Sequence, residues 1–305
     1  MGDNSKISWT EATWNPVIGC KRVSPGCDHC YAFQLHDQRY IAWKRGRMPD
    51  APAQYHKPFS QIQLMEDRLD KPLHWRKPRR IFVNSLSDLF HEDVPEKFIA
   101  RLFAVMAVAR QHTYQVLTKR PERMERVVGE EWFVDMVAEA LKPLVAKHDL
   151  GPFYIDFIRR VWPLPNVWLG TSVEDQERAK ERIPRLIRTP AAIRFLSCEP
   201  LLGPIDLKRA AWSGDGPRII ITPEQALTGR WGHHVLDWVI VGGESGPHYR
   251  EMDLDWARQI RDDCLAAGVA FFYKQSSGRR SGMNPTLDGV EWHQYPEIQN
   301  DQGLS

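Results

Sequence analysis

Three of the five cysteines of this sequence lie within eleven residues, at Cys20, Cys27 and Cys30. They belong to the segment GCKRVSPGCDHC, whose glycine, proline and serine content predicts a loop. Packing gives a small apolar side chain little in a loop, whereas backbone turns can direct several thiolates toward one centre. Cys27 and Cys30 form a CxxC pair, a spacing that lets two sulfurs share one metal or cluster. The loop is therefore predicted to hold a metal centre.

The spacing leaves two kinds of metal centre open. A structural zinc ion takes four ligands, and His29, inside the CxxC pair, is badly placed to complete a tetrahedron. A distant ligand such as Cys198 or a histidine would then be required. An iron–sulfur cube held by three cysteines instead leaves one iron available to an external ligand, which suits three thiols without a fourth.

The remaining two cysteines, Cys198 and Cys264, are weaker candidates for metal ligands. Cys264 lies on the apolar side of the helical pattern DLDWARQIRDDCLAAG and is expected to pack in a core. Cys198 follows an apolar run and could be a pocket wall, which we favour, a fourth ligand or a buried strand residue. The odd number of cysteines argues against structural disulfides.

Composition limits the classes of protein that the chain can belong to. The 305 residues, 42% hydrophobic and 26% charged, are typical of a globular protein and long enough for one large domain or two small ones. The repeated strand–helix pattern described below favours a single domain spanning residues 1–305. A net charge of +2 neither favours nor excludes a nucleic acid as partner. The N-terminal segment MGDNSKISWTE resembles no signal peptide, and no window approaches the ~20 apolar residues of a membrane span. We therefore expect a cytoplasmic protein without a membrane partner.

Short apolar runs alternate with helical patterns along most of the chain. The runs are RIFVNSLSD (80–88), TYQVLTKR (113–120), NVWLGTSVED (166–175), IRFLSCEP (193–200), DWVIVGGESG (237–246) and VAFFYKQSSG (269–278). Helical stretches follow several of them, one opening with Pro95 as its first residue and one stopping at Gly268. Such alternation predicts an α/β fold with a parallel sheet. With a further strand expected in KISWTEATW (6–14), we predict a full or partial TIM-like β/α barrel of six to seven strands.

Two stretches interrupt this alternation and are predicted to be insertions. Residues 129–166 are expected to be helical, and residues 208–234 to form a glycine-rich loop or hairpin. The basic run RLDKPLHWRKPRR (68–80) could contact phosphates, although a solvated lead-in to the next strand is the favoured interpretation.

Polar and charged side chains follow every predicted strand. Those suited to binding a ligand are Ser85, Asp88, Lys119, Arg120, Glu174, Glu199 and Glu244. Any strand can end in polar turn residues, but ionisable groups after so many strands call for another explanation. Barrel enzymes carry their active sites at the C-terminal ends of the strands, where the cysteine loop would also open.

Several segments together resemble a known family. A strand, a three-cysteine loop ending in Cys30–Tyr31 and repeated β/α units look like the radical S-adenosylmethionine superfamily. The segments WNPVIGCKRVSPGCDHCYA, FVNSLSDLF, LTKRPERM, WLGTSVEDQ, FLSCEPLLGPI and VIVGGESGP resemble the three-cysteine-motif family of phages and bacteria, which is predicted to be radical-S-adenosylmethionine-like. The resemblance extends from about Ile7 to about Gln275.

The resemblance implies cofactors and a reaction. Cys20, Cys27 and Cys30 would bind three irons of a 4Fe–4S cluster, and S-adenosyl-L-methionine would chelate the fourth. Reduction by an electron donor such as a flavodoxin or ferredoxin would release a 5′-deoxyadenosyl radical that abstracts hydrogen from an unidentified substrate, which could be a nucleoside or nucleic acid.

The same resemblance implies roles for the charged residues at the strand ends. Asp88, Glu174, Glu199 or Glu244 would accept hydrogen bonds from the ammonium of S-adenosyl-L-methionine, and Lys119 or Arg120 would bind its carboxylate.

The sequence departs from the superfamily in two places. Six residues separate Cys20 from Cys27, where the superfamily has CxxxCxxC. The Gly-Gly-Glu segment expected after the second strand is replaced by NSLSDLF, in which Ser85 and Asp88 could substitute, and Gly242-Gly243-Glu244 lies far downstream. The alternative function is a non-catalytic zinc or iron–sulfur protein that binds a nucleic acid or a protein partner.

Overall fold

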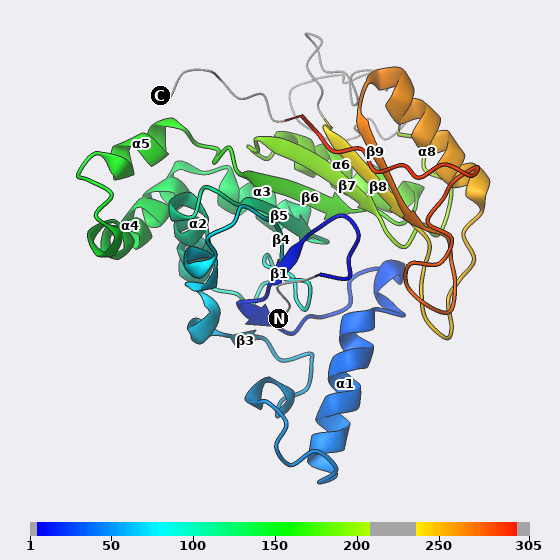
Figure 1. Ribbon diagram of the computed structural model, residues 1–305, viewed down its shortest axis with the longest axis horizontal. Coiled ribbons are helices and arrows are strands. Elements are labelled where there is room, and N and C mark those ends of the chain that lie inside the picture. The colour runs from blue at the N-terminus through cyan, green and yellow to red at the C-terminus, as the bar shows by residue number, and fades with distance from the viewer. Residues whose placement is uncertain (1–4, 208–235, 298–305) are drawn as a thin grey trace.

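A single parallel sheet organises the chain. The structure is a computed structural model that describes residues 5–207 and 236–297. Seven strands pair in the order β1-β4-β5-β6-β7-β8-β9, and every pairing is parallel. Their bounds are Ala12–Trp14, Arg80–Val83, Thr113–Thr118, Val167–Ser172, Ile193–Cys198, Trp238–Gly242 and Ala270–Gln275. Figure 1 shows the sheet curled into a half-barrel, so the predicted barrel is present in its partial form.

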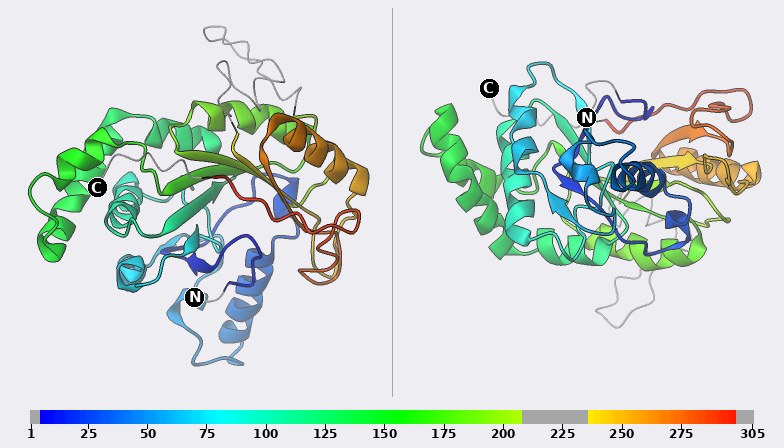
Figure 2. Two further views of the ribbon diagram at one scale, coloured as in Figure 1. Left: turned by 45° about the horizontal axis from the view of Figure 1, so that its top comes forward. Right: turned by 90° about the horizontal axis from the view of Figure 1, so that it is seen from below.

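Helices cover the outer, convex face of this sheet, as Figure 2 shows. They are α2 (Glu96–Val108), α3 (Pro121–Val128), α4 (Glu131–His148), α5 (Tyr154–Arg160), α6 (Gln176–Arg188) and α8 (Leu254–Ala267). Short 3-10 helices lie at Pro25–Cys27, Ala53–Tyr55, Glu66–Arg68 and Lys71–His74. The predicted alternation of strands and helices is therefore confirmed for the described parts of the chain.

Local sequence signals account for the helix ends, with one correction. The Asp175 carboxylate caps α6 by accepting a hydrogen bond from the Arg178 N–H at 2.8 Å. Gly268 ends α8 in the left-handed region at φ 70°, which suits a residue without a side chain. Pro95 precedes α2 as its extended N-cap rather than opening the helix, and Glu96 is the first helical residue.

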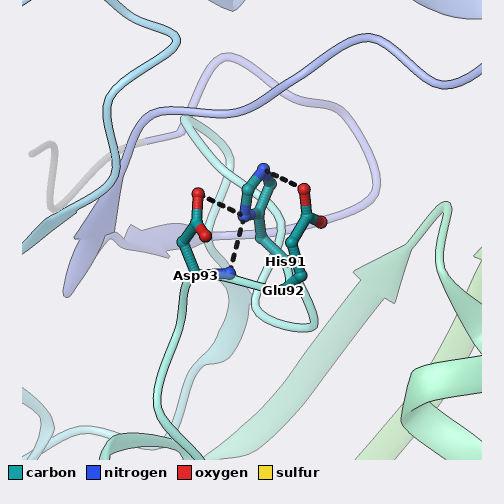
Figure 3. A group of neighbouring side chains, drawn as sticks. All are labelled: His91, Glu92 and Asp93. Atoms are coloured by element: carbon teal, nitrogen blue, oxygen red, sulfur yellow. Dashed lines mark hydrogen bonds and ion pairs between the residues drawn. The ribbon is translucent and has the colours of Figure 1, made fainter.

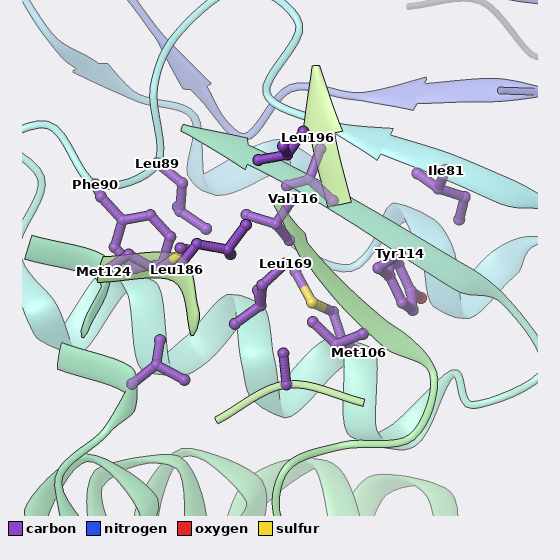
Figure 4. Packing of buried hydrophobic residues seen from close by; sticks show 14 of the residues in the cluster. Ile81, Leu89, Phe90, Met106, Tyr114, Val116, Met124, Leu169, Leu186 and Leu196 are labelled. Carbon is purple, nitrogen blue, oxygen red and sulfur yellow. The ribbon is translucent and has the colours of Figure 1, made fainter. Parts of the chain in front are cut away.

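The sheet has a different apolar layer on each face. On the convex face, strand residues such as Val116, Leu169 and Leu196 pack against the helices, including Met106 of α2 and Leu186 of α6 (Figure 4). The concave face carries a smaller, mostly aromatic cluster: Trp9, Phe82, Trp168, Ile193, Phe195, Trp238, Ile240 and Phe272. This cluster fills the half of the barrel interior that lies toward the N-terminal ends of the strands.

The insertion predicted at 129–166 is helical, and α4 and α5 form it. Phe133 of α4 packs edge-on against Phe103 of α2, with ring centroids 5.3 Å apart, so the insertion extends the wall of helices. The insertion predicted at 208–234 lies outside the described residues.

The segment near the C-terminus packs across the half-barrel. Residues near the C-terminus run beside β9, where His293 bridges Phe272 in antiparallel orientation. The Tyr295 ring lies 5.2 Å from the Trp238 ring and beneath the guanidinium of Arg80 on β4. The tail therefore crosses the N-terminal end of the half-barrel.

One helix stands apart from the sheet. Helix α1 (Tyr31–Lys44) projects away from the half-barrel directly after the cysteine loop (Figure 1). The chain returns from its tip to the short antiparallel pair β2 (Val17–Ile18) and β3 (Gln63–Leu64). Across the described residues, none of the helices has the length and apolar character that crossing a membrane requires.

Candidate functional site

A large cavity occupies the other half of the barrel interior, at the C-terminal ends of the strands. Its volume is about 590 Å³, within the range of ligand pockets. The predicted residues that line it are Cys20, Cys27, Cys30, Ser85, Asp88, Lys119, Arg120, Glu199 and Glu244. Glu174 is the predicted residue that does not line it. Six strands and the cysteine loop thus contribute to one site.

The three thiols line the same cavity but do not form a tight group. All five cysteines are free. In the described ranges, the three side chains whose ligand atoms all lie within 4.8 Å of one another are His91, Glu92 and Asp93, so at least one pair of these sulfurs is farther apart. The metal centre expected in this loop is therefore not preformed as a close group of three sulfurs in the described residues. A tetrahedral zinc ion with Zn–S bonds of about 2.3 Å needs sulfurs about 3.8 Å apart, whereas a cube binds each thiolate through a different iron.

Arg120 holds the Cys20 side of the loop. Its Nη1 donates to the Cys20 sulfur at 3.7 Å and to Asp88 Oδ2 at 3.0 Å. Its Nη2 donates to the carbonyl of Lys21 at 3.2 Å. Burial raises the pKa of the Cys20 thiol to about 12, Asp88 adds to this effect, and Arg120 opposes it. A metal bound by Cys20 would therefore have to displace a proton from this thiol.

Asp88 is saturated by hydrogen bonds from the protein. Its carboxylate accepts from the Thr118 hydroxyl at 2.7 Å, the Phe90 N–H at 3.0 Å and the Lys119 N–H at 3.0 Å, in addition to Arg120. We therefore assign Asp88 to positioning Arg120.

The close group His91, Glu92 and Asp93 lies beside this network (Figure 3). The ammonium of Lys21 contacts the carboxylates of Glu92 at 3.3 Å and Asp93 at 3.0 Å. The Nδ1 of His91 accepts a hydrogen bond from the Asp93 N–H at 3.1 Å. Burial lowers the pKa of His91, so the ring is neutral near pH 7 and carries its proton on Nε2. Because Lys21 already pairs with both carboxylates, we assign this group to holding Lys21, the residue that follows Cys20.

Glu174, which follows β6, binds the middle of the cysteine loop. Its Oε1 accepts a hydrogen bond from the Gly26 N–H at 3.2 Å, and its Oε2 pairs with Arg182 at 3.1 Å. A Cβ atom on Gly26 would lie 3.1 Å from the Glu174 carboxylate, so the glycine permits this close approach. Glu174 is completely buried, which makes it an anchor of the loop rather than a wall of the cavity.

Glu244 holds the Cys27–Cys30 side of the loop. Its carboxylate pairs with Arg250 and lies 2.9 Å from Nδ1 of His29. Arg250 also donates to the carbonyl of Pro25 at 2.9 Å and contacts Asp28 at 3.4 Å. Burial alone would raise the pKa of Glu244, but the hydrogen bonds from Arg250 and His29 lower it overall. Glu244 is therefore charged near neutral pH and fixes this part of the loop.

Glu199 and Lys274 form the far wall of the cavity. Lys274 Nζ lies 2.6 Å from Glu199 Oε1, and the indole N–H of Trp9 donates to Oε2 at 3.2 Å. A Cβ atom on Gly242 would lie 2.9 Å from Glu199, so this glycine makes room for the carboxylate. Glu199 is thus held by donors from two distant segments.

Lys119, Asn84 and Ser85 are polar side chains of the cavity that remain available to a ligand. Lys119 forms no ion pair with any residue in the described ranges, in contrast to Arg120. The side-chain N–H₂ of Asn84, which also lines the cavity, is buried without a partner among those residues. Asn84 has a left-handed backbone at φ 63°, a conformation that asparagine tolerates. Ser85 lies next to it and donates to Asn15 at 3.1 Å, which leaves its oxygen free to accept.

Cys198 does not line the cavity. Side chains alternate between the two faces of a strand, so Ser197 faces the cavity and Cys198 faces the helices. Cys198 belongs to the convex-face core with 0% exposure, which corrects the favoured assignment to the pocket wall. Cys264 packs in the same core, as expected.

Trp9, Asn84, Arg250 and Lys274 contribute to this site but were not among the predicted site residues. Asn84 and Lys274 lie within the predicted runs 80–88 and 269–278, so their positions carried a signal. Arg250 and Trp9 lie in loops without a recognisable motif.

The architecture defines an α/β half-barrel with a loop-held thiol site at the C-terminal ends of its strands. The chain belongs to the family described as "Protein of unknown function (DUF5131)", whose model matches residues 4–296. Searches of curated proteins and of solved structures found no match.

Proposed function

We propose that this protein is an iron–sulfur enzyme of the radical S-adenosylmethionine type. The observation that carries the proposal is that Cys20, Cys27 and Cys30 line one cavity of about 590 Å³ at the C-terminal mouth of a parallel half-barrel. The histidine between them, His29, is engaged with Glu244. Three thiols without a ready fourth ligand suit a 4Fe–4S cluster with one iron open to S-adenosyl-L-methionine.

The chain would contribute binding and positioning. With both cofactors bound, one-electron reduction would supply a 5′-deoxyadenosyl radical that abstracts hydrogen from the substrate. Lys119 is the predicted cation that is not already paired, so we assign it to the cofactor carboxylate. We assign the Ser85 oxygen to accept a hydrogen bond from the cofactor ammonium. The predicted carboxylate acceptors already bind protein donors: Asp88, Glu174, Glu199 and Glu244.

The donor to the Cys20 sulfur has an electrostatic role. A hydrogen bond from the Arg120 guanidinium stabilises negative charge on a thiolate. Hydrogen bonds to the ligating sulfurs are one of the levers that set cluster potential. Arg120 would thus bias the cluster toward its reduced state.

The electron donor would approach the exposed part of the cysteine loop. Arg22 is exposed and has no ion pair among the described residues, and Val23 is 44% exposed. An acidic flavodoxin or ferredoxin would complement Arg22. The loop that holds the cluster would then also receive the electron.

The proposal is tested by anaerobic reconstitution with iron and sulfide. We expect a brown protein with about four irons per chain, whose reduced spectrum changes when S-adenosylmethionine is added. Reduction in its presence should release 5′-deoxyadenosine. The alternative function predicts instead a colourless protein with one zinc ion, or a cluster that does not respond to S-adenosylmethionine.

The chain offers matched controls for this experiment. Alanine at Cys20, Cys27 or Cys30 should remove most of the iron. Serine at Cys198 or Cys264, on the opposite face of the sheet, should leave the iron content unchanged. Equal losses in both groups would assign the iron to nonspecific binding.

A further inference from the structure

The projecting arm is basic; we define it as residues 31–62, formed by α1 and the segment that returns to β3. The arm contains five lysines and arginines and two aspartates, a net charge of +3. A surface with this excess of cations attracts polyanions.

The cations of the arm are not used in structural pairing. Lys44, Arg45, Arg47 and Lys57 are all exposed, and none has an ion pair within residues 5–207 and 236–297. Three of them follow one another closely where α1 ends. Exposed arginines and lysines without carboxylate partners are free to contact phosphates.

Stacked aromatic rings accompany these cations. The rings of Trp43 and His56 stack with centroids 4.3 Å apart and planes 11° apart. Tyr40 continues the stack at 6.3 Å from Trp43. All three rings are partly exposed, so flat faces lie beside the basic tip. Aromatic faces next to cations are the combination that binds bases and phosphates of single-stranded nucleic acids.

The arm leads directly to the candidate site. Tyr31 and Phe33, in the first turn of α1, line the cavity, and Arg22 lies 4.1 Å above the Phe33 ring. Fourteen helical residues extend about 21 Å from that rim to the basic tip. A single-stranded nucleic acid bound along the arm would therefore place a nucleotide at the mouth of the cavity.

We propose that the arm binds the phosphate backbone of a single-stranded nucleic acid. An acidic protein would satisfy the cations but would leave the stacked rings unused, so a nucleic acid fits both features. That the bound strand is also the substrate rests on the proposed function; the binding itself does not.

The test is fluorescence anisotropy with labelled DNA and RNA oligonucleotides, single-stranded and duplex, on the full-length protein over a range of salt concentrations. Replacing Lys44, Arg45 and Arg47 by glutamine should weaken single-strand binding at least tenfold. It should also reduce the slope of log affinity against log salt by about two, since each phosphate contact contributes about 0.7. The matched control replaces the exposed residues Lys97, Lys147 and Lys180 by glutamine and should change neither quantity.

Four outcomes would overturn the inference. They are no binding of single strands by the unmodified protein, equal losses in the arm and control variants, stronger binding of the duplex, and stronger binding of a poly-glutamate peptide. Iron content, measured on the same variants, should not change. A failure of arm binding is thus distinguishable from a failure of the cluster proposal.

Discussion

The two ends of the barrel interior use different residues for the same space between the strands. Toward the N-terminal ends of the strands, the Trp238 ring contacts Trp168, Phe195 and Phe272 at centroid distances of 5.6 to 6.1 Å. Toward the C-terminal ends, the same strands carry serines, glycines and charged side chains, and the interior is hollow. Stability is therefore concentrated at one end and ligand-binding groups at the other.

A few positions mark the boundary between the ends. A Cβ atom on Gly170 would lie 2.6 Å from the Phe195 ring, so this glycine makes room for a ring of the aromatic cluster. Two residues further along β6, Ser172 faces the hollow end. The change from large to small side chains over one strand creates the cavity.

The largest effect is expected at the filled end. Trp238→Ala removes a completely buried ring and should lower the free energy of unfolding by about 4 kcal/mol. Denaturant unfolding of the metal-free protein measures it, with Trp132→Ala, at a position 40% exposed, as control. If Trp238→Ala lowered the free energy of unfolding no more than Trp132→Ala, the aromatic end would not be the more stabilising end of the barrel interior.

Glu174 tests whether any charge at the hollow end is structural. Glu174→Gln leaves Arg182 buried without its carboxylate and should cost about 3 kcal/mol. The same unfolding measurement applies, and the exposed Glu177→Gln should cost less than about 1 kcal/mol. Iron content should also fall, because Gly26 loses its anchor. Unchanged stability would place Glu174 among ligand-binding groups.

Lys119 is the contrasting case, a charge at the hollow end that has no ion pair among the described residues. Lys119→Met should weaken S-adenosylmethionine binding about a hundredfold, or about 2.7 kcal/mol, without changing stability or iron content. Equilibrium binding to the reconstituted protein measures this, and the exposed Lys97→Met serves as control. Unchanged affinity would leave the carboxylate site unassigned.

The smallest effect is a pH dependence from Glu244. Its pKa is lowered from the ordinary 4.5, so its contribution to stability is present above that pH and is lost as pH falls through the folded-state value. Glu244→Gln should therefore cost about 2 kcal/mol near neutral pH and progressively less below pH 4.5. Unfolding of both proteins across this range measures the difference. A difference that grows on acidification would contradict the assignment.

Local sequence patterns were enough to predict the order and type of the strands, the helical insertion and the set of polar residues at the strand ends. Strand and helix periodicities are local, and the C-terminal ends of parallel strands necessarily share one edge. This is why nine of the ten predicted residues line one cavity. The same alternation contained the signal that Cys198 faces away from Ser197.

Which of these charges are available to a ligand could not be predicted, because it depends on partners brought together by the fold. Glu174, Glu199 and Glu244 looked equivalent in sequence, but their partners Arg182, Lys274 and Arg250 come from other segments. The same holds for the spacing of the three sulfurs, which is set by anchors after several different strands. Pairing between distant side chains depends on how the chain brings them together in space, and local sequence patterns carry no record of it.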